Sequence, residues 1–129
     1  MKRITVTELL VLHYHLVQRT QGDTNCVGVR DPHALESALW QPFQVIGAAD
    51  LYRDPFTKAS VLAANVITGH PFFDGNKRTG IVAGITFLEI NGYLIMASDN
   101  DVYDAAYRTA SGEWQRENLM EWFLGHVHI

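Results

Sequence analysis

The segment from Lys77 to Ile90, KRTGIVAGITFLEI, constrains the fold most, because as a helix it is apolar on nearly every side. Within it, Gly80, Ala83 and Gly84 are small enough to let neighbouring elements approach closely. A bilayer span needs about 20 apolar residues, and the most apolar window of the chain stops well short of that. The sequence therefore predicts a buried central helix that other elements must cover.

Apolar residues at helical spacing predict five further helices around the central one. These helices are expected to begin at Val6, Pro32, Pro55, Asp99 and Glu113. The first four follow side chains that can cap a helix, namely Thr5, Asp31, Asp54 and Ser98. A chain of 129 residues suits one core. We therefore expect a single domain over residues 1–129, all-α, a compact bundle of about six helices.

Two stretches do not fit a helix. Residues 20–31 are rich in Gly, Asn and Asp and predict a loop, in which Cys26 is expected to be a thiol without a catalytic task. The segment from Pro42 to Asp54 predicts a loop or short hairpin. Because this segment is too irregular for a helix and too apolar for a plain linker, we expect an edge or flap along which an extended target peptide aligns.

Reactive side chains concentrate in GHPFFDGNKRTG, between two predicted helices. The first amides of the following helix lack intrahelical acceptors and, with the helix dipole, form an anion site, to which Lys77 and Arg78 add positive charge. Asp74 can hold Mg²⁺, and His70 can accept a proton from an attacking hydroxyl near neutral pH. The sequence thus predicts a base, a metal ligand and a phosphate cradle in one loop.

A purely structural interpretation competes with this one. Asp74, Gly75 and Asn76 could form only a tight turn with a helix cap, and His70 could pack on aromatic side chains. However, a cation at a helix N-terminus opposes the dipole by roughly a few tenths of a kcal/mol unless an anion is present. The Lys77–Arg78 pair therefore favours an anion site.

The motif HPFFDGNKR resembles the signature of the Fic/Doc family. Lys77 matches the Doc branch, known as death-on-curing toxins, whereas most Fic proteins carry Gly at this position. The segments GVRDPHALESAL and FLEINGY also resemble flanking parts of Doc-like proteins. The resemblance covers most of the chain and implies a helical fold of about six helices.

The resemblance implies a role for each motif residue. His70 resembles the general base that activates a hydroxyl of a target protein, Asp74 resembles the Mg²⁺ ligand, and Phe72 matches a position expected to pack in the core. The positions expected to bind the phosphates of ATP are Gly75, Asn76, Lys77 and Arg78.

Two departures bear on the reaction. In AMP-transferring Fic enzymes a second Arg follows the first by three residues, but this chain has Ile81 there, and Lys77 fills the place of a small residue. Both favour a Doc-like kinase that transfers the γ-phosphoryl group of ATP. The expected function is a toxin of a toxin–antitoxin pair that phosphorylates a hydroxyl of a translation factor, by analogy elongation factor Tu, and arrests translation. AMP transfer and a catalytically inactive binding module with the same fold stay open as alternatives.

The resemblance also bears on regulation. Self-inhibited Fic proteins carry a Ser/Thr-x-x-x-Glu-Gly/Asn segment, but the one Glu followed by Gly or Asn here is Glu117, and Glu113 stands four residues before it. Self-inhibition by that route is therefore expected to be absent. A separate antitoxin protein is implied as the inhibitor instead.

Composition narrows the remaining classes. Ten Lys and Arg against 14 Asp and Glu give a net charge of −4, which argues against direct nucleic-acid binding. The segment MKRITVTELLVLHYH lacks the apolar run of a signal peptide, so a cytoplasmic location without a membrane is expected. His13, His15, His126 and His128 are expected to be core or surface histidines rather than metal ligands.

Overall fold

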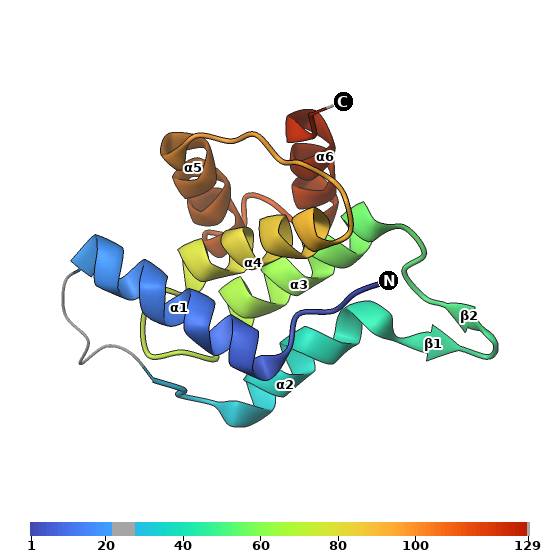
Figure 1. Cartoon of the computed structure of the whole chain (residues 1–129), viewed down its shortest axis with the longest axis horizontal. Helices are drawn as coiled ribbons and strands as arrows, with labels where there is room; N and C mark the ends of the chain where they lie inside the picture. The colour runs from blue at the N-terminus through green and yellow to red at the C-terminus, as the bar shows by residue number, and fades with distance from the viewer. Residues whose placement is uncertain (22–27, 129) are drawn as a thin grey trace.

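The computed structural model describes residues 1–21 and 28–128, and this part of the chain contains six α-helices (Figure 1). Their bounds are α1 (Val6–Gln21), α2 (Pro32–Trp40), α3 (Pro55–Gly69), α4 (Asn76–Ile90), α5 (Asp99–Ala110) and α6 (Arg116–His126). A 3₁₀ turn, η2 (Gln41–Phe43), and a small hairpin of β1 (Val45–Ile46) and β2 (Ala49–Asp50) separate α2 from α3. The predicted helical fold is confirmed. Cys26 and half of the predicted loop at 20–31, residues 22–27, lie outside the described residues.

The antiparallel helices α3 and α4 form the centre of the molecule, with α1 and α2 on one side and α5 and α6 on the other (Figure 1). Their close approach depends on glycine. A Cβ added at Gly80 would lie 2.7 Å from Ile67 Cγ1 and 2.8 Å from the backbone oxygen of Ala63. At Gly84 it would lie 2.5 Å from Phe123 Cζ, on α6. The predicted burial of α4 is therefore confirmed, and at Gly80 and Gly84 the neighbouring elements leave no room for a side chain.

None of the helices within the described ranges combines the length and the apolar character that crossing a membrane requires.

The predicted caps account for most helix starts. Asp31 accepts a hydrogen bond from the Ala34 amide (3.1 Å), and Asp54 accepts one from the Thr57 amide (2.8 Å). Side chains of this kind satisfy amides that have no acceptor within the helix. Ser98 likewise forms a capping box with Asp101. Local sequence thus sets where these three helices begin.

The last helix is an exception, because the predicted start at Glu113 is wrong and α6 begins at Arg116. The backbone after α5 turns through Gly112 at φ 86°, and the amide of Trp114 then bonds back to the Arg108 carbonyl at 3.0 Å. These contacts hold residues 112–114 in a turn, so the helix starts only after Gln115, which caps it.

The predicted hairpin is confirmed. It leads into the N-terminus of α3, whereas His70 follows the C-terminus of the same helix. A helix of 15 residues is about 22 Å long. The hairpin therefore lies at the opposite end of α3 from His70 (Figure 1), so a target peptide aligned along it would lie away from the reactive loop. Buried Lys58 ties this end to α3 by bonding the Tyr52 carbonyl and Asp50.

Candidate active site

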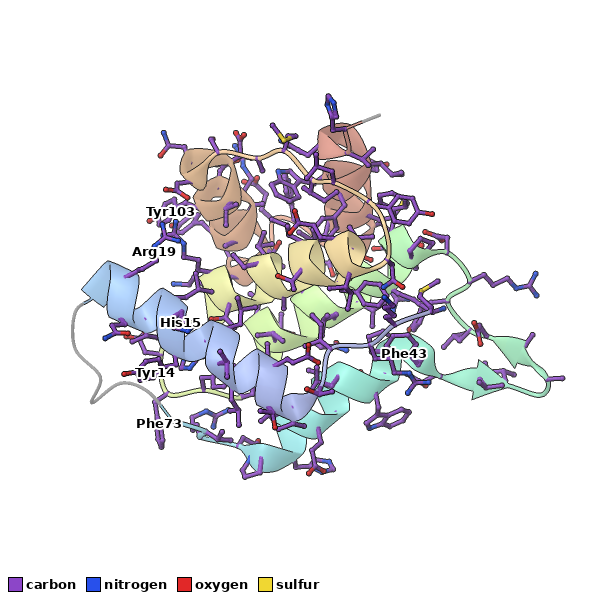
Figure 2. All side chains as sticks on the ribbon, in the orientation of Figure 1. Tyr14, His15, Arg19, Phe43, Phe73 and Tyr103 are labelled. Carbon is purple, nitrogen blue, oxygen red and sulfur yellow. The ribbon has the colours of Figure 1, made fainter. Side chains whose placement is uncertain are left out.

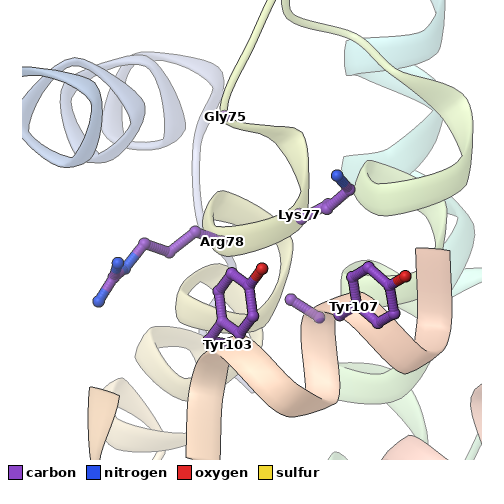
Figure 3. A pocket seen from close by; sticks show the side chains of 6 residues that line it. Gly75, Lys77, Arg78, Tyr103 and Tyr107 are labelled. Atoms are coloured by element: carbon purple, nitrogen blue, oxygen red, sulfur yellow. The ribbon is translucent and has the colours of Figure 1, made fainter. Parts of the chain in front are cut away.

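The loop between α3 and α4 brings the predicted site residues together around two neighbouring cavities. One, of about 210 Å³, is lined by His70, Phe73, Asp74, Gly75, Asn76 and Lys77. The other, of about 190 Å³, lies between the N-terminus of α4 and α5 and is lined by Gly75, Lys77, Arg78, Tyr103, Ala106 and Tyr107 (Figure 3). The exposed side chain of Phe73 projects away from the body of the molecule at the rim of the first cavity (Figure 2).

His70 takes the left-handed conformation that reverses the chain after α3. Gly69 ends the helix as predicted, but the residue with positive φ is His70, at φ 48° and ψ 56°. In residues 1–21 and 28–128 no other non-glycine residue has a positive φ. This conformation costs an L-residue about 1–2 kcal/mol. The exposed imidazole is thus placed by a backbone conformation that its surroundings must stabilise.

Arg30 contacts this turn from a distant part of the sequence. Its Nε donates a hydrogen bond to the His70 carbonyl at 2.7 Å, and its Nη2 donates one to the Gly69 carbonyl at 3.1 Å. Arg30 lies outside the HPFFDGNKR motif. The two partners are 39 and 40 positions away, so no spacing pattern within the motif could indicate the contact.

His13 holds the next part of the loop from α1. Its ring stacks on buried Phe72 with 3.8 Å between ring centroids and 6° between planes, and its Nε2 donates to the Asp74 carbonyl at 2.7 Å. Burial lowers the pKa of His13, and the hydrogen bond to Asp74 and the charge of Asp74 offset part of this lowering. Of the two alternatives expected for His13, core or surface, the structure shows a core histidine, and the predicted packing of Phe72 is confirmed. The hydrogen bond from His13 to Asp74 was not expected from the sequence.

Asn76 serves the loop through its side chain. Its Oδ1 accepts from the Phe72 amide at 3.0 Å, and its Nδ2 donates to the Phe72 carbonyl at 2.9 Å. Both ends of this buried carboxamide are therefore engaged within the protein. Asn76 can therefore contribute to phosphate binding only through its backbone amide, which belongs to the first turn of α4.

Gly75 forms the start of α4 in a conformation that favours glycine, with φ 77°. A Cβ there would lie 3.1 Å from Val17 Cγ2 and 3.4 Å from His13 Nε2. The Gly75 amide bonds the Asp74 carboxylate at 2.7 Å. A side chain at position 75 would be strained by the positive φ and crowded against α1, so this position requires glycine.

The two cations leave the first turn of α4 in different directions (Figure 3). Lys77 is exposed and borders both cavities. The Arg78 guanidinium lies 3.2 Å from Asp99 at the start of α5. No acidic residue occupies the first turn of α4 itself. An incoming anion would therefore meet the helix dipole and Lys77, and would compete with Asp99 for Arg78.

Asp74 is compatible with a metal shared with a nucleotide. Among the described residues no group of three or more His, Cys, Asp or Glu side chains could hold a metal ion. Mg²⁺ in phosphate-transferring sites is usually bound by one or two carboxylates together with substrate phosphates and water. An exposed carboxylate beside the N-terminus of α4 fits that arrangement.

Comparison with known proteins points in the same direction. The model of the Fic/DOC family matches residues 3–88. Over 74 residues the chain is 39% identical to Toxin Doc of Mycolicibacterium smegmatis. This match covers 57% of this chain and 56% of that relative's length. Over 113 residues it is 29% identical to Protein kinase doc of Escherichia phage P1, covering 88% of this chain and 86% of that protein.

Proposed function

This chain belongs to the Fic/DOC family, and from that premise we propose that it is the toxin of a toxin–antitoxin pair and acts as an ATP-dependent protein kinase. Two relatives, one named a toxin and one a protein kinase, support this proposal. The observation that carries it is the convergence of His70, Asp74 and Lys77 on one cavity at the N-terminus of α4. The proposed substrate is a hydroxyl of a translation factor, with elongation factor Tu as the first candidate, so the proposed site of action is the cytoplasm.

Each group has a role in the proposed reaction. His70 takes the proton of the target hydroxyl while its oxygen attacks the γ-phosphorus of ATP. The bond from that phosphorus to the bridging oxygen breaks, and ADP leaves. The amides of α4 with Lys77 and Arg78 hold the phosphates. When bound with ATP at Asp74, Mg²⁺ would supply positive charge that offsets the charge of the phosphates.

Ile81, three residues after Arg78, favours phosphoryl transfer over AMP transfer. Ile81 is fully buried in the core and adds no charge at the cavities. The anion site therefore has Lys77 and Arg78 as its cationic side chains from α4, without the second arginine of the AMP-transferring branch. AMP transfer is the alternative that the experiment must exclude.

The test uses ATP labelled separately at the α and γ phosphates, with Mg²⁺ and purified elongation factor Tu, and in parallel a translation extract. We expect label in protein from γ-labelled ATP alone, and none with His70→Ala. His33→Ala removes an exposed histidine of α2 and serves as the matched control, with transfer retained. Label from the α position would show AMP transfer, and no label from either would favour the binding module.

An antitoxin is the second proposed partner, on the ground that one relative is named Toxin Doc. Glu117, the residue nearest to a self-inhibiting pattern, lies in the first turn of α6 and pairs with Arg116 at 3.4 Å. Co-expression with the protein encoded beside this chain should relieve growth arrest and yield a complex of the two proteins. Growth arrest that persists despite a stable complex would contradict this role.

A further inference from the structure

The segment from Gly28 to Asp31 pairs with the loop that carries His70. Val29 and Phe72 form an isolated antiparallel bridge. The amides of Arg30 and Asp31 both donate to the Pro71 carbonyl, at 2.8 and 3.1 Å. The backbone thus carries Arg30 to the C-terminal end of α3, where its guanidinium bonds two successive carbonyls.

Those carbonyls are the ones that need a donor. The last four carbonyls of an α-helix have no partner within the helix, and the dipole places partial negative charge at this end. Arg30 supplies two N–H donors in a fixed fork and a positive charge at the same point. Since one of the two acceptors belongs to His70, the fork fixes the orientation of the peptide that follows this residue.

We infer that Arg30 is a positioning residue for His70. Its fork holds residue 70 in the left-handed conformation that aims the imidazole at the cavity with Asp74 and Lys77. Without the fork, residue 70 relaxes toward the right-handed region, which redirects its Cβ and its ring. Arg30 touches neither substrate nor metal in this scheme. The inference rests on the proposed function of His70 as general base.

The test compares Arg30→Ala and Arg30→Lys with Arg53→Ala. Arg53 is an exposed arginine at the other end of α3, so its removal changes the net charge equally without contact to His70. Misplacing a catalytic group by about 1 Å can cost on the order of 100-fold in rate. We expect Arg30→Ala to lower kcat by roughly 10- to 100-fold while KM for ATP stays near wild type and the loss of two exposed hydrogen bonds lowers Tm by only a few degrees. Arg30→Lys keeps one point-like donor group, so its kcat should lie between those of Arg30→Ala and wild type. Arg53→Ala should have the kcat of wild type.

A second readout does not depend on activity. The ring resonances of His70 in NMR spectra, assigned with His70→Gln, should shift and broaden in Arg30→Ala and stay unchanged in Arg53→Ala. Wild-type kcat together with unchanged His70 resonances in Arg30→Ala would overturn the inference, and so would an equal loss of kcat, ATP binding and Tm. If the wild-type chain transfers no phosphate at all, the proposed function fails, and the His70 resonances alone decide the role of Arg30.

Discussion

The backbone of the loop that carries His70 and Asp74 and leads into α4 is held by single side chains from elsewhere in the chain. His13 bonds the carbonyl of Asp74 and Arg30 bonds the carbonyl of His70. The motif supplies the reactive groups, and these two residues outside it fix the backbone that presents them. Two residues outside the motif therefore hold the reactive loop, one from α1 and one from residues 28–31.

Substitutions of Arg78 and of Asp99 should change the affinity for ATP in opposite directions. Removing the guanidinium by Arg78→Ala should weaken ATP binding by about 10- to 100-fold, since hydrogen bonds to charged groups contribute about 1.5–3 kcal/mol. Asp99→Asn should instead tighten binding by up to about fivefold, because it frees Arg78 from an exposed ion pair worth about 1 kcal/mol or less. Calorimetric titration of ATP with Mg²⁺ measures both.

Circular dichroism provides the control, with helicity and Tm expected to stay at wild-type values in both variants. Unfolding of Arg78→Ala, or equal ATP affinity in all three proteins, would show that Arg78 does not face the bound phosphates.

At the scale of elements, the contact between α3 and α4 is set by Gly80. Gly80→Ala would bring a methyl group to 2.8 Å from the backbone oxygen of Ala63, which cannot rotate away. We expect the free energy of unfolding to fall by about 1–3 kcal/mol, as for other overpacked cores. Gly125→Ala, in α6, meets no atom within 4 Å and should raise it by up to about 1 kcal/mol through helix propensity.

Urea denaturation of the three proteins checks this prediction. A Gly80→Ala variant as stable as wild type would mean that α3 and α4 can move apart without loss, contrary to the packing described above.

The helices were predictable from the sequence to the extent that local chemistry decides them. Capping side chains such as Asp54 and Ser98 fix helix starts within a few residues, and the apolar pattern of α4 fixes its burial. The start of α6 was missed because the contact of Trp114 with Arg108 overrides the local pattern. The distance of the hairpin from His70 could not be predicted, because it depends on the length and direction of α3.

At the scale of the whole molecule, the site is assembled where four segments meet: α1, residues 28–31, the loop with the start of α4, and α5. The motif identified the reactive residues because they are contiguous in sequence. It could not identify Arg30 or Asp99, whose contribution depends on how the other segments pack around the loop. The α3–α4 pair serves as the rigid base on which these segments converge.

The central claim is that His70 acts as a base and not as a structural histidine. The most direct test measures His70→Ala in two ways, by growth of cells that express it and by Tm with ATP and Mg²⁺ present. A general base contributes about 10²- to 10⁴-fold in rate, so we predict that His70→Ala no longer arrests growth while keeping the Tm increase that nucleotide gives the wild-type chain. A His70→Ala protein that still arrests growth at normal expression would contradict the account.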